Sequence, residues 1–398
     1  MAEQRNVVIL GASFGGLSAA HYFLKHTLPT LKTAKDAEYA LHVVDPSTHF
    51  WWHHGAPREI VSIKQMPHDK YFVSIESAFK QYASLKDSIH VHHATATGLD
   101  AEKRQVIFKP HGSDVEETLP YYALVIATGV RSPTPLTTLQ GDYTITQRAL
   151  EEMNTILASA KEVVIGGGGP IAVETAGEIG AHLKGKGAKV TIVTSGNKLL
   201  PVLGKKFSDK AHKMLTKVGV TVVYNTKIET ADPSANGKTD VKLSNGETIA
   251  ADAYIPAVGV TPNTEFLPAN LKTAAGWVDV NAQTLRVDVA GQRVYAAGDV
   301  AAVDQGGALN LFKTIPIVGN NMRSDLFAAA KVGGTVAEKK FIRKDSETQL
   351  VPVGPGQGVG AFNGFGMPSF MVASFKGKDY MQGQMSDIVV TGNKWKKA

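Results

Sequence analysis

The sequence predicts an α/β fold in which two parallel-sheet domains precede a smaller C-terminal domain. A pattern of strand, glycine-rich turn, helix and strand occurs twice, about 155 residues apart. The length of 398 residues exceeds what one hydrophobic core usually organises. After residue 330 the composition changes, because glycine becomes frequent and alternates with phenylalanine and methionine. These three observations predict two Rossmann-like domains and a third, smaller unit.

The first repeat opens with an apolar strand over 6–10, a glycine turn and a helix over 17–25. A second strand over 41–44 ends at Asp45, where a carboxylate can accept a hydrogen bond from a ribose hydroxyl. The alternative for Asp45 is a turn aspartate before a proline.

The turn "GASFGG" fits two incompatible motifs. One is the nucleophile elbow G-x-S-x-G, which would make Ser13 an attacking group. The other is a dinucleotide-binding turn, in which Gly11, Ser13 and Gly16 occupy the three glycine positions and Gly15 lies beside them. Only one strand precedes Ser13, and no histidine stands in a recognisable triad context, so the nucleotide interpretation is favoured.

The second repeat has a strand over 162–165, four consecutive glycines, a helix over 170–184 and a strand over 189–193. Gly167 and Gly169 match the fingerprint, and Pro170 suits a first helical turn. No acid follows the second strand; Thr194, Ser195 and Lys198 stand there instead. A 2′-phosphate would not be repelled, so NADPH is expected as a substrate, alone or alongside NADH.

Three later stretches resemble signatures of flavoproteins with two dinucleotide-binding domains. They are "YALVIATGV" with Thr128 and Gly129, "AYIPAVGVTPN" with Gly259, and "RVYAAGDVA" with Asp299. The resemblance implies FAD in the first turn, with Asp299 on its ribityl chain, and NADPH or NADH in the second. It also implies that the chain returns to the first domain over 277–323, and that a helix from about residue 316 follows Asp299 and points its N-terminus at the flavin.

The implied fold class is α/β, with two Rossmann-like domains, the second inserted in the first, plus a small C-terminal α+β domain. The expected domains are 1–150 with 271–330 for FAD, 151–270 for NAD(P)H, and 331–398 closing over the flavin. Edge strands and turns are expected over 225–246. Low complexity is the alternative for the C-terminal unit, but four phenylalanines make it too apolar for a disordered tail: Phe362, Phe365, Phe370 and Phe375.

"GGGGPIAVETAGEI" and "GVGAFNGFGMPSFMVASFKGKD" resemble the apoptosis-inducing-factor-like flavoproteins of the mitochondrion-associated inducer of death and ferroptosis suppressor group, which are NAD(P)H:quinone oxidoreductases. By that resemblance Glu174 and Lys376 meet beside the flavin as catalytic residues. The alternatives are a favourable acid early in a helix for Glu174 and a surface turn for Lys376. "HFWWHHGAPRE", residues 49–59, matches no standard metal-ligand set. It is interpreted as pocket lining, with Pro57 and Arg58 nearest the cofactor.

The chain has no cysteine, which excludes disulfides, thiolate catalysis and iron–sulfur clusters. No signal peptide or membrane span is apparent, so a cytoplasmic protein is expected. Residues 331–398 carry ten Lys and Arg against five Asp and Glu, and could contact a membrane peripherally. No specific nucleic acid is expected.

The expected function is transfer of hydride from NAD(P)H to FAD and of electrons onward to a quinone-type acceptor. One alternative keeps the same reductive half-reaction with a pathway-specific small molecule or oxygen as acceptor. A second, of another class, is a flavin-containing protein that binds DNA or a protein partner.

Overall fold

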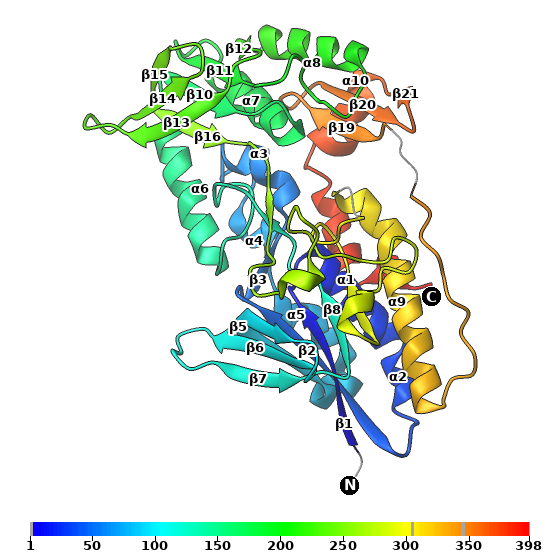
Figure 1. Cartoon of the computed structure of the whole chain (residues 1–398). Helices are drawn as coiled ribbons and strands as arrows, with labels where there is room; N and C mark the ends of the chain where they lie inside the picture. The colour runs from blue at the N-terminus through cyan, green and yellow to red at the C-terminus, as the bar shows by residue number, and fades with distance from the viewer. Residues whose placement is uncertain (1–2, 304–305, 344–346, 398) are drawn as a thin grey trace.

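The computed structural model describes residues 3–303, 306–343 and 347–397. A seven-stranded sheet forms the lower part of the molecule in Figure 1, and a four-stranded parallel sheet lies in the upper part. The first has the strand order β18-β8-β1-β2-β5-β6-β7 and the second β12-β11-β10-β16. Two such sheets in one chain confirm the predicted Rossmann-like α/β fold.

The first sheet contains β1 (Glu3–Leu10), β2 (Ala37–Asp45), β5 (Ile89–Asp100), β6 (Gln105–Pro110), β7 (Glu117–Pro120), β8 (Ala123–Ile126) and β18 (Val294–Ala296). Its first five strands in spatial order run parallel, and β6 and β7 are added antiparallel. The second contains β10 (Glu162–Gly166), β11 (Lys189–Val193), β12 (Val220–Val223) and β16 (Ala253–Pro256). Their apolar runs are buried, as strands covered by helices on both faces require.

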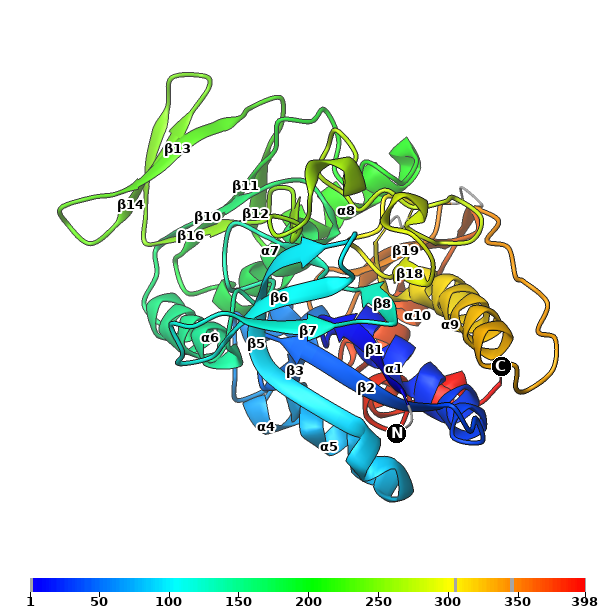
Figure 2. The ribbon, with the colours of Figure 1, turned by 60° about the horizontal axis from the view of Figure 1, so that its bottom comes forward.

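Smaller sheets extend this framework. An antiparallel sheet, seen edge-on in Figure 2, consists of β13 (Ile228–Pro233), β14 (Thr239–Leu243) and β15 (Thr248–Ala251). Two-stranded pairs join β3 (His49–Trp51) to β4 (Phe72–Ser74) and β9 (Val130–Arg131) to β17 (Thr261–Pro262). The C-terminal sheet has β19 (Gln349–Pro352), β20 (Gly358–Phe362) and β21 (Phe365–Gly366).

The helices that position the site are α1 (Phe14–His26), α3 (Ala56–Glu59), α7 (Pro170–Leu183) and α9 (Ala308–Ala330). The others are α2 (Leu28–Leu31), α4 (His68–Tyr71), α5 (Ile75–Phe79), α6 (Tyr143–Leu157), α8 (Lys205–Lys217) and α10 (Ser369–Val372). Two of them begin earlier than expected. Helix α1 starts three residues before Leu17, and α9 starts at Ala308 and carries Pro316 inside it. Within the described ranges, no helix combines the length and the apolar character needed to span a membrane.

In the described part of the C-terminal segment, strands are confined to 349–366 and short helical turns follow. The four phenylalanines that suggested a core there do not form one: they are 55% to 80% exposed, and the set is Phe362, Phe365, Phe370 and Phe375. The strands instead bury Val351 and Val359, and the end of the chain buries Ile388, Val389 and Trp395. That last part packs on α1, close to α9, far from the C-terminal sheet (Figure 1).

Candidate active site

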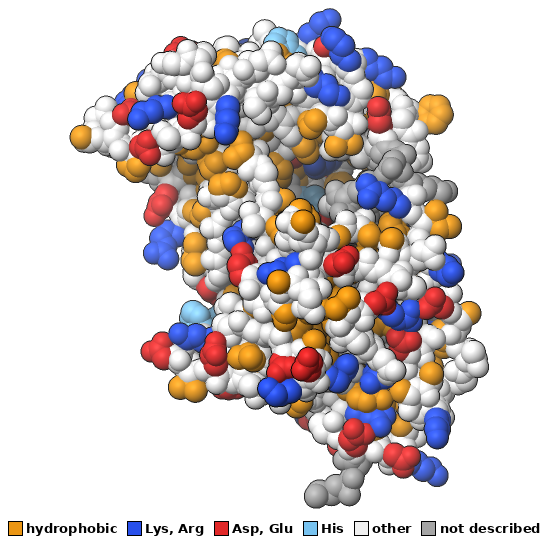
Figure 3. Space-filling model, viewed as in Figure 1, with side chains coloured by type: hydrophobic (Ala, Val, Ile, Leu, Met, Phe, Trp, Pro, Cys, Tyr) orange, Lys and Arg blue, Asp and Glu red, His pale blue; other side chains and the backbone are white. Residues whose placement is uncertain are grey.

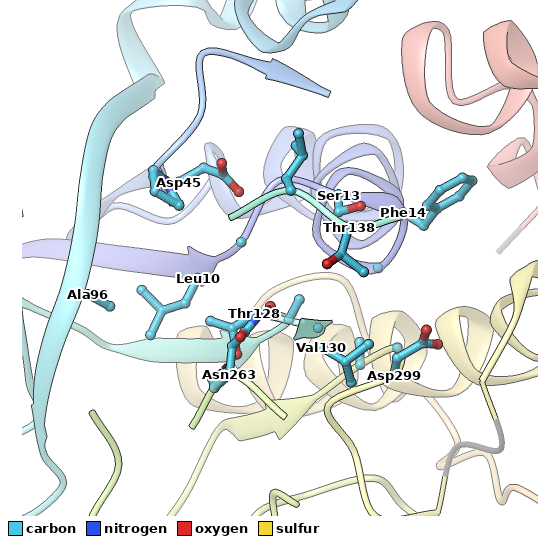
Figure 4. A pocket seen from close by; sticks show the side chains of 18 of the residues that line it. Leu10, Ser13, Phe14, Asp45, Ala96, Thr128, Val130, Thr138, Asn263 and Asp299 are labelled. Atoms are coloured by element: carbon cyan, nitrogen blue, oxygen red, sulfur yellow. Dashed lines mark hydrogen bonds between the residues drawn. The ribbon is translucent and has the colours of Figure 1, made fainter. Parts of the chain in front are cut away.

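A cavity of about 430 Å³ opens at the carboxyl ends of β1, β2 and β8. This edge of a parallel sheet is where open α/β folds bind ligands. Seven of the predicted cofactor residues line it: Gly11, Ser13, Gly15, Asp45, Thr128, Gly129 and Asp299. Figure 4 shows Asp45 at one end of the cavity and Phe14 and Asp299 towards the other, with Ser13 between them.

The glycines of the first turn are required by close backbone approach. Gly11 has φ +95°, and a Cβ placed on it would lie 2.4 Å from the carbonyl oxygen of Ala127. A Cβ on Gly16 would lie 1.7 Å from the carbonyl oxygen of Gly11, although Gly16 itself does not line the cavity. A Cβ on Gly15 would meet the Ala297 carbonyl at 3.1 Å. The turn therefore brings β1, β8 and α1 together at distances that side chains would prevent.

The N-terminus of α1 is free to bind an anion. Ser13 is its N-cap residue, yet its hydroxyl makes no capping hydrogen bond, and the first turn has no acidic residue. Unpaired N–H groups and the positive end of the helix dipole thus face the cavity. A pyrophosphate fits such a site without further charged residues.

Asp45 is held in a fixed orientation at the end of β2. Its Oδ2 accepts from Ala12 N at 2.5 Å and its Oδ1 from Ser47 N at 2.8 Å. Burial raises its pKa to about 6, and the two backbone donors oppose that shift. A partly desolvated carboxylate with a spare lone pair on each oxygen is suited to accept hydrogen bonds from ribose hydroxyls.

The side of the cavity that faces Asp45, Ser13 and Phe14 is formed by two loops and the start of α9 (Figure 4). The Thr128 Oγ1 hydroxyl donates to the Asn263 carbonyl at 2.7 Å, and Asn263 Nδ2 donates to the Thr128 carbonyl at 2.9 Å. Asp299 Oδ1 accepts from Gly307 N at 3.3 Å, and burial raises the pKa of Asp299. Gly129, with φ +63°, has no atom within 4 Å of a Cβ placed on it, so backbone is open to a ligand there.

The second turn repeats this construction in the other parallel sheet. Gly167 has φ +120°, and a Cβ on it would lie 2.3 Å from the Ala257 carbonyl oxygen. Gly169 is the N-cap of α7 and Pro170 is its first residue; a Cβ on Gly169 would meet no atom within 4 Å. The N-terminus of α7 therefore also presents free backbone donors to open space.

The predicted phosphate-binding residues of this second turn differ in their exposure to solvent and in their hydrogen bonds. Ser195 is exposed, whereas Thr194 is buried and its Oγ1 accepts from Gly196 N. Lys198 Nζ donates to the Leu203 carbonyl at 2.8 Å. Gly259 has φ +59° and is exposed in the loop after β16. Of Thr194, Ser195 and Lys198, Ser195 is thus the exposed one.

Glu174 and Lys376 form an ion pair, but neither is among the residues that line the cavity, so their position beside the flavin stays a prediction. Lys376 Nζ lies 2.5 Å from Glu174 Oε1 and also donates to the Leu350 carbonyl at 3.2 Å. The Lys376 side chain is 14% exposed and the Glu174 side chain 3%, so the ion pair is largely shielded from water. Burial raises the pKa of Glu174, and Lys376 opposes that shift. Helix α7 and the C-terminal segment are joined at this point.

A second buried ion pair lies one helical turn further along α7, and the sequence analysis missed it. Arg58 binds Glu178 through two nitrogens, at 2.8 and 3.1 Å, and donates to the carbonyls of Gly377 and Lys378. The Tyr380 hydroxyl donates to Glu178 at 3.0 Å. Arg58 and Pro57 are not among the residues that line the cavity. The i, i+4 spacing of Glu174 and Glu178 on an otherwise apolar helix was the signal available in the sequence.

The stretch 49–59 contributes three cavity residues, Trp51, His53 and His54. The two histidine rings stack at 5.2 Å, and Phe14 contacts both edge-on at 5.1 and 5.0 Å. Burial in these apolar surroundings lowers the pKa of His53 to about 4 and that of His54 below its usual range. Within the described part of the chain, no group of three His, Asp or Glu residues is arranged to hold a metal ion.

Two glycine turns that each open a helix, the first with Asp45 at the end of β2 and Asp299 after β18, define a flavoprotein oxidoreductase with two nucleotide-binding units. Residues 5–323 match the family described as pyridine nucleotide-disulphide oxidoreductase. The chain belongs to this family, whose members use FAD together with NAD(P)H. Because the chain has no cysteine, it has no thiols for the disulphide chemistry in the family's name.

Fungal relatives cover nearly the whole chain. Oxidoreductase phnG of Penicillium herquei is 39% identical, over 95% of this chain and 94% of its own. Oxidoreductase ptaL of Pestalotiopsis fici is 30% identical, over 94% of this chain and 95% of its own. Apoptosis-inducing factor 1 of Saccharomyces cerevisiae is 24% identical, over 96% and 98%.

Solved structures show the same fold. A NAD-dependent persulfide reductase from A. fulgidus superposes with a TM-score of 0.63 at 24% identity, over 90% of this chain and 64% of that one. Reduced Bacillus anthracis CoADR-RHD gives a TM-score of 0.64 at 17% identity, over 88% and 60%. This chain therefore spans less than two thirds of those longer chains.

Proposed function

We propose that this protein is an FAD-dependent NAD(P)H oxidoreductase that passes electrons to a quinone-type acceptor. The observation that carries the proposal is the buried Glu174–Lys376 pair, which belongs to neither nucleotide-binding turn. When bound, FAD accepts hydride from NAD(P)H and releases electrons to an acceptor in a separate step. The protein's task is to position both partners and to stabilise the charge that develops.

Each member of the pair is suited to one part of that task. The Glu174 carboxylate lies early in α7, behind the second glycine turn, where it can accept a hydrogen bond from a nicotinamide carboxamide. The Lys376 ammonium can stabilise negative charge on the flavin or on a quinone oxygen. Pairing also avoids the cost of burying either charge alone. Figure 3 shows the molecule hollowed between its upper and lower parts, the region that substrates would enter.

We also propose that the protein is closer to the inducer-of-death and ferroptosis suppressor group than to thiol-dependent members of the family. The support is the Glu174–Lys376 pair, the C-terminal segment whose helical turn Ala373–Gly377 carries the lysine, and the lack of cysteine. A cytoplasmic location is part of this proposal and can be checked by imaging the tagged protein.

The deciding experiment is anaerobic mixing of the FAD-loaded protein with NADPH, followed by addition of a short-chain quinone or of oxygen. Loss of flavin absorbance with NADPH and its rapid return with quinone are expected. No loss of absorbance with either nicotinamide nucleotide would refute the oxidoreductase assignment. If the flavin absorbance returns with oxygen but not with quinone, the acceptor is oxygen and not a quinone.

NADPH is expected to be used at least as well as NADH. The chain after β11 offers the exposed hydroxyl of Ser195 and no carboxylate that would repel a 2′-phosphate. Steady-state kcat/KM values for the two nucleotides provide the measurement. A preference for NADH above a hundredfold would contradict this prediction.

The proposed membrane contact of the basic C-terminus would be electrostatic. Lys394, Lys396 and Lys397 are exposed, but Trp395 is buried and its Nε1 donates to the Ile388 carbonyl. The contact should therefore need anionic lipid and disappear in high salt. Co-sedimentation with neutral and with anionic vesicles tests it, and equal binding to both would exclude it.

A further inference from the structure

The reaction proposed above needs a proton that NAD(P)H does not supply. Reduction of a quinone to a quinol consumes two electrons and two protons, whereas a hydride brings two electrons and one proton. The balance is NAD(P)H + H⁺ + quinone → NAD(P)⁺ + quinol. A group at the cavity must therefore take a proton from solvent and pass it on.

Few groups at the cavity are free for this task. Among the described residues, five of those that line the cavity are titratable: Asp45, His53, His54, Glu265 and Asp299. Asp45 and Asp299 are the carboxylates assigned to FAD. Glu265 forms an ion pair with Arg131 and is more than half exposed. The two histidines remain.

His53 and His54 form a stacked pair in an aromatic cage. Their rings are 5.2 Å apart at an interplanar angle of 11°. Phe14 packs against both, Trp52 lies 5.1 Å from His54 and Trp51 lies 6.1 Å from His53. Among the described residues, Nδ1 of His54 is buried without a hydrogen-bond partner. Both imidazoles line the cavity, so they can exchange a proton with a ligand there.

We propose that the His53–His54 pair is the proton carrier of this cavity: it takes one proton from solvent when two-electron reduction adds negative charge, and gives it to the acceptor when the electrons leave. The stacking limits the pair to one proton, because two imidazolium rings in contact would repel each other. This inference rests on the proposed function only in requiring FAD at the cavity.

The surrounding charges favour a switch between two protonation states. Lys376 is the cation that acts on His54 and opposes its protonation, and Glu174 partly neutralises it. Behind Trp51 lies the carboxyl of Glu59, whose pKa is raised to about 8 by burial, so it is neutral at pH 7. In the oxidised state, burial keeps the histidines uncharged. A negative charge that reduction places near the pair would stabilise an imidazolium and raise its pKa.

The test is the pH dependence of the flavin midpoint potential, measured on the FAD-loaded protein between about pH 5 and 7. One extra proton per two electrons steepens the slope by about 30 mV per pH unit. The slope of the midpoint potential against pH is therefore expected to be steeper by that amount in the wild type than in the double variant His53→Phe/His54→Phe. Phenylalanine keeps the aromatic packing but cannot titrate. His49→Phe, the same change outside the cavity, is the matched control and should keep the wild-type slope.

Equal slopes in the wild type and the double variant would overturn the proposal. If the phenylalanine variant loses FAD, the same comparison is made with His53→Gln/His54→Gln. The potential is set with an electrode and mediators, so the measurement needs neither NAD(P)H nor a quinone. A protein that fails to reduce quinones can thus still show the steeper slope, and a quinone reductase can fail to show it.

Discussion

At the scale of single residues, Ser13 illustrates how neighbours determine what a side chain can do. Ser13 occupies the N-cap position of α1, but its hydroxyl makes no capping hydrogen bond. It lies between Gly11 and Gly15 on the cavity wall. A nucleophile elbow would need a histidine within reach. His53 and His54 line the same cavity, but no hydrogen bond joins either of them to Ser13 among the described residues. The five-letter match to the elbow motif is explained by the shared strand–turn–helix geometry alone.

Ser13→Gly is expected to keep FAD with its affinity changed by no more than about threefold, because the helix N-terminus supplies the main donors. Ser13→Leu should bind FAD at least about tenfold more weakly, since a branched side chain would occupy the space of the pyrophosphate. Flavin content after dialysis and the Kd of FAD for the apoprotein are the measurements. Retention of FAD by the leucine variant would contradict this.

Lys376→Met should lower turnover at least about tenfold, or roughly 1.4 kcal/mol of transition-state stabilisation, with FAD still bound. The substitution keeps the length of the side chain and removes the charge that faces Glu174. Stopped-flow reduction by NADPH and the flavin spectrum are measured together. Lys378→Met, two residues away and exposed, is the control and should behave as wild type. Unchanged turnover in the Lys376 variant would remove its catalytic role.

At the scale of elements, the short helix α3 carries two buried side chains, one basic and one acidic. Arg58 reaches Glu178 on α7, while Glu59 points the other way and accepts from Trp51 Nε1 on β3. The sequence analysis placed Arg58 beside the cofactor because the stretch 49–59 was interpreted as lining the cofactor pocket. The structure shows it linking α3, α7 and the C-terminal segment, a role that depends on contacts across 120 and 320 residues of chain.

Glu59→Gln is expected to stabilise the protein at neutral pH. Burial raises the pKa of Glu59 to about 8, so the folded form holds a proton that the unfolded chain releases above about pH 4.5. This linkage lowers stability progressively from about pH 4.5 to 8, by on the order of 3 kcal/mol at pH 7. The glutamine variant should lose that slope in denaturant unfolding at pH 5 to 8. Glu76→Gln, on the exposed side of α5, is the control; identical slopes in both variants would contradict the prediction.

Local elements could be predicted where the pattern is local. The strands at residues 6–10 and 162–165 and the helix from Pro170 were identified, because apolar runs followed by glycine turns have few alternative structures. The start of α9 was missed because Pro316 suggested a first turn, whereas the helix tolerates the proline inside it. The exposed phenylalanines were misjudged because composition shows that a segment can fold, but not which side chains become its core.

At the scale of the whole molecule, the last residues of the chain complete the first domain. His21 on α1 bonds to the Val389 carbonyl at 2.9 Å, and His26 bonds to the Trp395 carbonyl at 2.6 Å. Ile388, Val389 and Trp395 are buried there. No sequence pattern indicated these contacts, because they join segments more than 360 residues apart.

Removal of residues 386–398 should therefore abolish stable FAD binding. The deletion exposes the apolar surface of α1 and removes three large buried side chains, each worth about 1.5–3 kcal/mol. Their sum is comparable to the entire stability of a typical domain. Soluble yield, flavin content and melting temperature are measured. Deletion of residues 396–398 is the control and should be tolerated; normal FAD content in the longer deletion would contradict this.

The same packing has a consequence for biosynthesis. A chain made from its N-terminus on the ribosome displays the glycine turn and α1 early, whereas strand β18 and the segment that covers α1 are made hundreds of residues later. The cofactor pocket cannot be completed before those later segments have been made. Stable binding of FAD must therefore wait for them, and until then the apolar face of α1 lacks the side chains that cover it in the folded protein.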